Sequence, residues 1–244
     1  MRTIAGRIRQ LLTRDGVPIL VALDGHSGAG KSTLAAAVAA EVGAVVVDTD
    51  DFYAGDPAEV WDTRRVAVER CIDWSRLRRE ALEPLMAGDM ASWHAFDWER
   101  DHGLAEELTV RSPGDVVILD GIYSARPELG DLVWLSVLLE APGEIRRSRV
   151  SHRDGRIDPW FDRWDRAERH YLQHLRPRDS FDLVVQGWEP SGGGGSQTNR
   201  LPPAKAAGEA QTSEISRLAR TAPPRPEAAG SHFEHLAQPR PAGE

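Results

Sequence analysis

The chain has 244 residues, 41% of them hydrophobic, enough for one good-sized domain or a domain with an appendage. Its net charge of −8, from 30 basic and 38 acidic residues, disfavours a nucleic-acid polymer as a partner. The single cysteine excludes an internal disulfide. The sequence has no signal-peptide core and no apolar run of about 20 residues, so we expect a cytoplasmic protein without a membrane span.

Residue patterns predict strands that alternate with helices along the chain. The predicted strands are residues 18–24, 44–48, 115–120, 132–139 and 181–185. The predicted helices are a short amphipathic one that begins near Ile4, followed by residues 32–42, 73–87, 143–153 and 160–175. This alternation predicts an α/β fold in which a doubly wound, mostly parallel five-stranded sheet carries helices on both faces.

The composition changes after Trp188, where Gly, Pro, Ala, Gln and Ser replace most large apolar residues. We therefore expect a folded domain over residues 1–188 and a disordered tail over residues 189–244. The GGGGS stretch at 192–196 is typical of a flexible linker. An alternative is a partner-binding helix over residues 212–220.

Residues 25–32, GHSGAGKS, fit the P-loop pattern G-x-x-x-x-G-K-[S/T] and lie between a predicted strand and a predicted helix. In such a loop, glycines turn backbone N–H groups toward phosphate oxygens, and the helix that follows adds its positive end. Lys31 would contact the β- and γ-phosphates, and Ser32 would bind Mg²⁺. The predicted nucleotide-binding residues are Gly25, His26, Ser27, Gly28, Ala29, Gly30, Lys31, Ser32 and Thr33.

Lysine usage supports this interpretation, because Lys31 and Lys205 are the only lysines among 30 basic residues. A compact ammonium is used where phosphates are expected, and arginine elsewhere in the predicted domain. Switch proteins, motor ATPases and small-molecule kinases share such a loop, so the motif alone does not define the reaction.

Three aspartates, Asp48, Asp50 and Asp51, follow the second predicted strand in the segment VDTDDFY. The carboxyl ends of strands are where open α/β sheets bind ligands. An aspartate at this position could accept a proton from an attacking hydroxyl or help to organise Mg²⁺. The alternative role, capping of the next turn, is favoured more for Asp48 and Asp51 than for Asp50.

At this segment the chain resembles the uridine kinase and phosphoribulokinase family of P-loop kinases. The resemblance continues in order through most of residues 18–187. Uridine kinases have Q-D-S-F-Y where this chain has TDDFY, which implies that Asp50 is the catalytic base. The strand VVILDGIYS resembles a family strand that ends in E-G-I, which implies that Asp120 reaches Mg²⁺ through water.

Three further segments carry implied substrate and phosphate contacts. CIDWSRLRREALEPL resembles the family's F-D-H-P-D segment and its helix, without the proline, and this implies a ribose contact for Asp73. HAFDWERDHG resembles Y-D-F-x-x-H-x-R, which implies nucleobase contacts for Phe96, Trp98 and His102. APGEIRRSRVSHRDGR resembles a helix and small lid whose arginines, Arg149 and Arg153, clamp the transferred phosphate. Trp160 and Trp164 have no counterpart in the family pattern.

These motifs favour an ATP- and Mg²⁺-dependent phosphotransferase that acts on a small hydroxylated molecule, with uridine or cytidine as the first candidate. Other acceptors stay open, among them a pantothenate-like acid, a sugar or an antibiotic. A nucleotide-binding regulatory ATPase without a second substrate is the alternative outside the kinases. The resemblance is also compatible with a homo-oligomer.

Overall fold

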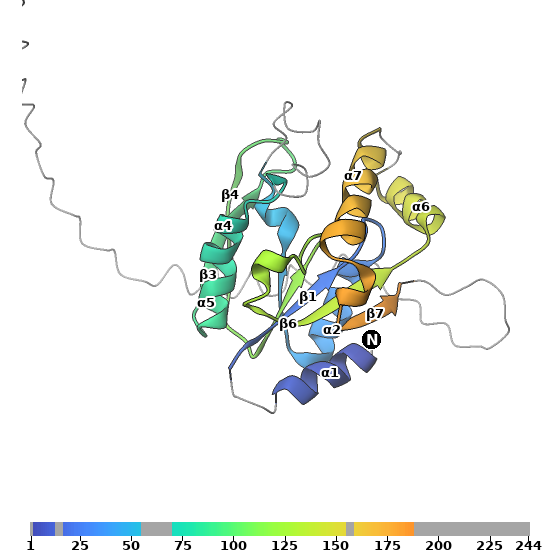
Figure 1. Cartoon of the computed structure of the whole chain (residues 1–244). Helices are drawn as coiled ribbons and strands as arrows, with labels where there is room; N and C mark the ends of the chain where they lie inside the picture. The colour runs from blue at the N-terminus through green and yellow to red at the C-terminus, as the bar shows by residue number, and fades with distance from the viewer. Residues whose placement is uncertain (1, 13–16, 55–69, 155–158, 188–244) are drawn as a thin grey trace, which may run out of the picture. The chain divides into compact units, whose positions relative to one another are not determined.

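The computed structural model describes residues 2–12, 17–54, 70–154 and 159–187 (Figure 1). The expected tail over 189–244, with its alternative helix, lies outside these residues. None of the helices described is both long enough and apolar enough to cross a membrane.

A five-stranded parallel sheet forms the centre of the described chain, in the order β2-β5-β1-β6-β7. The strands are β1 (Ile19–Asp24), β2 (Val45–Asp48), β5 (Val116–Asp120), β6 (Val133–Glu140) and β7 (Leu183–Gln186). Each coincides within two residues with a strand predicted from an apolar run. Buried residues fill β1 and β5 without alternation, because helices cover both faces of these strands.

Helices follow most strands and confirm the doubly wound arrangement. They are α1 (Arg2–Leu12), α2 (Lys31–Val42), α4 (Trp74–Leu77), α5 (Glu83–Met86), α6 (Gly143–Asp154) and α7 (Pro159–His170). Short 3-10 segments are η1 (Thr49–Phe52), η3 (Pro127–Leu129) and η5 (Arg178–Ser180). Two π-helical segments are η2 (Arg78–Leu82), between α4 and α5, and η4 (Tyr171–Leu175), after α7.

The two sheet faces have separate cores. Ile4 and Ile8 of α1 pack with α2 against one face of β1, β5 and β6. On the other face, α4, η2 and α5 pack with residues of α7 and η4, including Tyr171. The loops at the carboxyl ends of the strands therefore lie between helices from both layers (Figure 1).

A two-stranded antiparallel hairpin, β3 (Ala91–Phe96) with β4 (Leu104–Arg111), was not predicted. β3 alternates, with Ala91, Trp93 and Phe96 buried, and it packs on the second core. β4 is mostly exposed and carries two glutamates, so its sequence lacks the apolar signal of the other strands.

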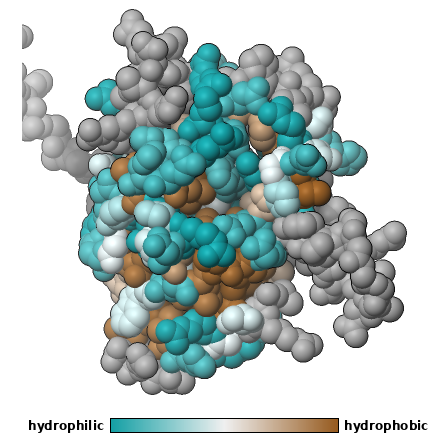
Figure 2. All heavy atoms as spheres, turned by 45° about the vertical axis from the view of Figure 1, so that its right-hand side comes forward, coloured by the Kyte–Doolittle hydropathy of each residue, from teal (hydrophilic) through white to brown (hydrophobic). Residues whose placement is uncertain are grey.

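The view in Figure 2 shows a face on which hydrophobic residues gather mainly in the lower half. Hydrophilic residues prevail at the height of α6 and α7, whose sequences are rich in arginine and acidic residues.

Candidate active site

The predicted phosphate loop connects β1 to α2 and requires its glycines. Gly25, Gly28 and Gly30 have φ angles of 139°, 77° and 101°, which side-chain-bearing residues rarely adopt. A Cβ on Gly25 would also lie 2.2 Å from the Leu139 carbonyl oxygen, and one on Gly28 would lie 2.6 Å from that of Arg146. The loop is therefore packed tightly against β6 and α6.

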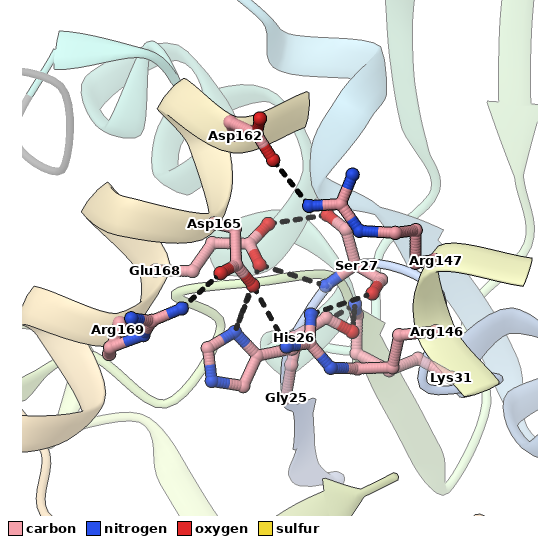
Figure 3. Close-up of polar contacts among 10 residues, drawn as sticks. All are labelled: Gly25, His26, Ser27, Lys31, Arg146, Arg147, Asp162, Asp165, Glu168 and Arg169. Atoms are coloured by element: carbon pink, nitrogen blue, oxygen red, sulfur yellow. Dashed lines mark hydrogen bonds and ion pairs between the residues drawn. The ribbon is translucent and has the colours of Figure 1, made fainter. Parts of the chain in front are cut away.

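Lys31, at the start of α2, folds its side chain back over this loop. Its Nζ donates to the carbonyl oxygens of Gly25 at 2.8 Å and His26 at 3.3 Å (Figure 3). Its positive charge also lowers the pKa values of nearby Asp50, Asp120 and Glu168, opposing the effect of their burial. The single Lys31 ammonium thus stabilises the charged forms of several carboxyl groups around the loop.

Carboxylates gather where β2 and β5 end. Asp48 and Asp120 are register partners on these adjacent strands. Asp48 Oδ1 also accepts a hydrogen bond of 2.9 Å from the Asp50 backbone N–H, which confirms its capping role. Burial of Asp48, then the charges of Asp50 and Asp120, raise its pKa to about 8. Like charges are therefore concentrated beside the phosphate loop.

The residues at this edge fit a Mg²⁺ ion. Asp120 is 2% exposed, and it shares a hydrogen bond with the Ser32 side chain. Its Oδ1 atom is buried and has no hydrogen-bond partner among the described residues. A hydroxyl and carboxylates are the hard oxygen ligands that Mg²⁺ prefers, and a cation would relieve the repulsion between Asp48, Asp50 and Asp120.

Asp50 is open to solvent on one side, yet neighbouring protein atoms limit the hydration of its carboxyl and raise its pKa. The charges of Lys31 and Arg153 act in the opposite direction. The structure therefore brings Asp50 together with two predicted phosphate-binding cations. A carboxylate with a raised pKa is a better proton acceptor than an ordinary aspartate.

The predicted substrate residues do not all converge. Phe96 and Trp98 join Tyr53 and Trp164 in an aromatic cluster, in which Trp98 stacks on Tyr53 with ring centroids 5.0 Å apart. Trp98 is 50% exposed, so part of its side chain is accessible to a ligand. Asp73 instead caps α4 by accepting from the Arg76 N–H at 2.9 Å, and His102 contacts the Arg100 carbonyl within its own turn.

The arginines of α6 contact the loop itself. Arg149 donates to the carbonyl oxygens of Gly28, Ala29 and Gly187, at 3.3, 2.9 and 2.8 Å. Arg153, one turn further along α6, lies close enough to Asp50 to lower its pKa. In this structure Arg149 therefore supports the loop, while Arg153 faces the cluster of aspartates.

Two buried acids at this site were missed by the sequence analysis. Asp24, the last residue of β1, accepts hydrogen bonds from the N–H groups of Gly25, Tyr123 and Ala125 and from the Tyr171 hydroxyl. Glu168 of α7 accepts from the Ser27 backbone and hydroxyl and lies 3.1 Å from His26 Nδ1. The available signal was an acidic residue in an otherwise buried run: Asp24 ends an apolar strand, and Glu168 follows Ala167 on the core face of α7.

A cavity of about 480 Å³ opens beside the loop. His26 and Arg146 line it, together with residues at the carboxyl ends of β6 and β7. Open α/β sheets bind ligands at this edge.

No family model and no curated protein sequence matches the chain. Among solved structures, a possible uridine kinase from Bacillus stearothermophilus is 20% identical, with a TM-score of 0.54 over 75% of this chain and 98% of that one. A candidate fructose transport system kinase from Silicibacter sp. TM1040 is 24% identical, with a TM-score of 0.59 over 74% and 98%. D-glycerate 3-kinase from Cryptococcus neoformans var. grubii serotype A is 13% identical, with a TM-score of 0.54 over 76% and 95%.

The loop, the strand order and the position of the carboxylates define a P-loop α/β protein. The three solved structures share this fold, which agrees with the P-loop kinase fold that the motifs predicted.

Proposed function

We propose that the protein is an ATP-dependent kinase that transfers the γ-phosphate to a hydroxyl of a small molecule, and that this molecule is a nucleoside, uridine or cytidine. The observation that carries the proposal is the position of Asp50 beyond the end of β2, close enough to Lys31, Arg153 and Asp120 for their charges to interact. A regulatory ATPase has no need of a proton acceptor beside an open aromatic surface.

Each residue has a role in this reaction. Backbone N–H groups of the phosphate loop bind the phosphates, and Lys31 leaves the carbonyls of Gly25 and His26 to contact the β- and γ-phosphates. Asp50 orients the acceptor hydroxyl and takes its proton, and Arg153 neutralises charge on the transferred group. Ser32 and Asp120 would hold Mg²⁺, which when bound neutralises phosphate charge during transfer.

The aromatic cluster supports a flat acceptor. The exposed part of Trp98 would offer a nucleobase an aromatic surface beside Tyr53 and Phe96.

A sugar or a hydroxy acid is the second candidate acceptor. Phe96 has no hydroxyl to donate, and His102 contacts the Arg100 carbonyl, so two polar contacts implied for a nucleobase are missing here. Two structural neighbours are named for fructose transport and for D-glycerate, so fructose and D-glycerate are the acceptors to compare with the nucleosides.

The test is ADP release by the full chain with Mg-ATP, measured with uridine, cytidine, fructose, D-glycerate or no acceptor. We expect uridine or cytidine to stimulate release. Lys31→Ala should abolish it, and Asp50→Asn should lower kcat by about 10² to 10⁴. Asp131→Asn, an exposed partner of Arg78, is the matched control and should leave turnover unchanged. Release that no acceptor stimulates would support the regulatory ATPase instead.

A further inference from the structure

Ser27, the third residue of the P-loop motif, is held through all its polar groups by the two helices beside the loop. Its backbone N–H donates to Glu168 Oε2 at 3.0 Å, and its hydroxyl donates to Glu168 Oε1. Its carbonyl oxygen accepts from Arg146 Nη1 at 3.4 Å. Figure 3 shows Glu168 reaching from α7 to the loop, with Arg146 on the facing helix α6.

The contacts of the buried Glu168 carboxyl favour its charged form. It is 1% exposed, and burial alone would raise its pKa. The hydrogen bond and charge of His26, the charge of Lys31 and the hydrogen bond from Ser27 together hold the pKa below its usual value. A buried carboxylate of this kind is kept in place by its partners, and these all belong to the phosphate loop.

A second acidic residue of α7 fixes the helix beside the loop. Asp165 binds Arg146 at 2.8 Å, accepts from Arg169 and lies 3.8 Å from His26 Nδ1. His26, Asp165 and Glu168 lie close enough to bind a cation. However, Arg146 and Arg169 already compensate Asp165, so the geometry favours a support for the loop over a metal site.

Ordering of the glycine-rich phosphate loop costs conformational entropy, which contacts from outside the loop can offset. Three of its glycines adopt left-handed backbone angles, and glycine-rich segments lose the most conformational entropy when they are ordered. A ligand that binds a loop already ordered does not lose affinity to that ordering. We propose that Glu168 is a positioning residue, which holds the first half of the phosphate loop in its nucleotide-binding conformation through Ser27. This inference rests on the proposed nucleotide-binding function.

The test is calorimetric titration of Mg-ADP into the full chain, with no acceptor present. Glu168→Ala removes both acceptors for Ser27 and should raise Kd about tenfold or more, a change of about 1.4 kcal/mol or more. Glu168→Gln keeps one carbonyl oxygen and should give an intermediate Kd. Asp162→Asn, on the same helix but exposed and paired with Arg147, is the matched control and should bind like the wild type.

A double-mutant cycle separates positioning from general support of the fold. Ser27→Ala removes the hydroxyl partner of Glu168, so it should weaken binding alone, add little in the Glu168→Ala background and add less in the Glu168→Gln background than in the wild type. Far-UV circular dichroism verifies that each variant is folded at the titration temperature. If Glu168→Ala does not fold, Glu168→Gln and Ser27→Ala still give the coupling.

The outcomes are distinct. A wild type that binds no nucleotide overturns the proposed function and this inference with it. A wild type that binds, with folded Glu168 variants of equal Kd, overturns the inference alone. Tighter binding by Glu168→Gln also overturns it, because the carboxylate would then compete with the phosphates. Weaker binding by both Glu168 variants, coupled to Ser27, supports it.

Discussion

Asp48 and Asp120 lie opposite each other on β2 and β5, so that two carboxylates occupy neighbouring strand ends beside the phosphate loop. Burial of Asp48 and the charges of Asp50 and Asp120 raise its pKa from 3.8 to about 8. Between these two values the folded protein holds a proton that the unfolded chain has released. The Asp48 contribution to stability therefore falls as the pH rises through this window.

We expect Asp48→Asn to become more stable relative to the wild type as the pH rises from 5 to 8, by at least about 1 kcal/mol. The amide keeps an acceptor oxygen for the Asp50 N–H and carries no charge. Urea unfolding at three pH values in Mg²⁺-free buffer measures the difference. A difference that does not vary with pH would contradict the raised pKa.

Tyr171→Phe should destabilise the fold more than Tyr123→Phe. Both rings are fully buried, and they pack edge to face 4.9 Å apart. The Tyr171 hydroxyl donates to Asp24 Oδ2 at 2.8 Å, whereas that of Tyr123 has no hydrogen-bond partner among the described residues. Loss of the Tyr171 hydroxyl should cost about 1–3 kcal/mol of unfolding free energy, and loss of the Tyr123 hydroxyl should cost little or nothing. Equal effects in urea unfolding would refute this account of Asp24.

Gly25→Ala should be far more damaging than Gly43→Ala. Both positions have positive φ, which costs a side-chain-bearing residue about 1–3 kcal/mol. A Cβ at Gly43 meets nothing within 4 Å, whereas one at Gly25 collides with the Leu139 backbone. We expect Gly43→Ala to fold with a modest loss of stability and Gly25→Ala to lose several kcal/mol or not to fold. Thermal unfolding of the two variants compares them directly.

Trp98→Ala should raise the KM for the stimulating acceptor about tenfold and leave the KM for ATP near its wild-type value. Stacking of a base on an aromatic ring contributes about 1–3 kcal/mol, which this variant would lose. Trp134→Ala is the control, because Trp134 is also partly exposed but lies near the amino end of β6. Steady-state kinetics with both substrates varied give the two constants. An unchanged acceptor KM would remove Trp98 from the proposed site.

The five strands could be predicted because each is a short apolar run buried by helices, and the P-loop because its spacing is local. The hairpin could not be predicted in the same way, since the residues of β4 are mostly exposed and its pairing with β3 is antiparallel. Its stability comes from contacts of β3 with the second core, among them that of Trp93.

The interior of the site was harder to predict than its loop. Glu168 and Ser27 are 141 residues apart, and no local pattern connects them. Asp73 and His102 illustrate the reverse case: each fits a family segment, yet in this structure each contacts its own turn or helix. A sequence match gives the position of such a residue in the chain. The direction of its side chain is set by hydrogen bonds to its neighbours, which the match does not reveal.

The Lys31 side chain is the only lysine amine in the described residues, and Lys205 is the only other in the chain. Amine-directed chemical labelling therefore has only these two lysine side chains to react with, besides the α-amino group of the chain. An acylating reagent that reaches Lys31 reports on the phosphate loop, and peptide mass spectrometry separates this label from that on Lys205. Protection of Lys31 by a bound ligand would measure occupancy of the loop by any compound, without knowledge of the acceptor.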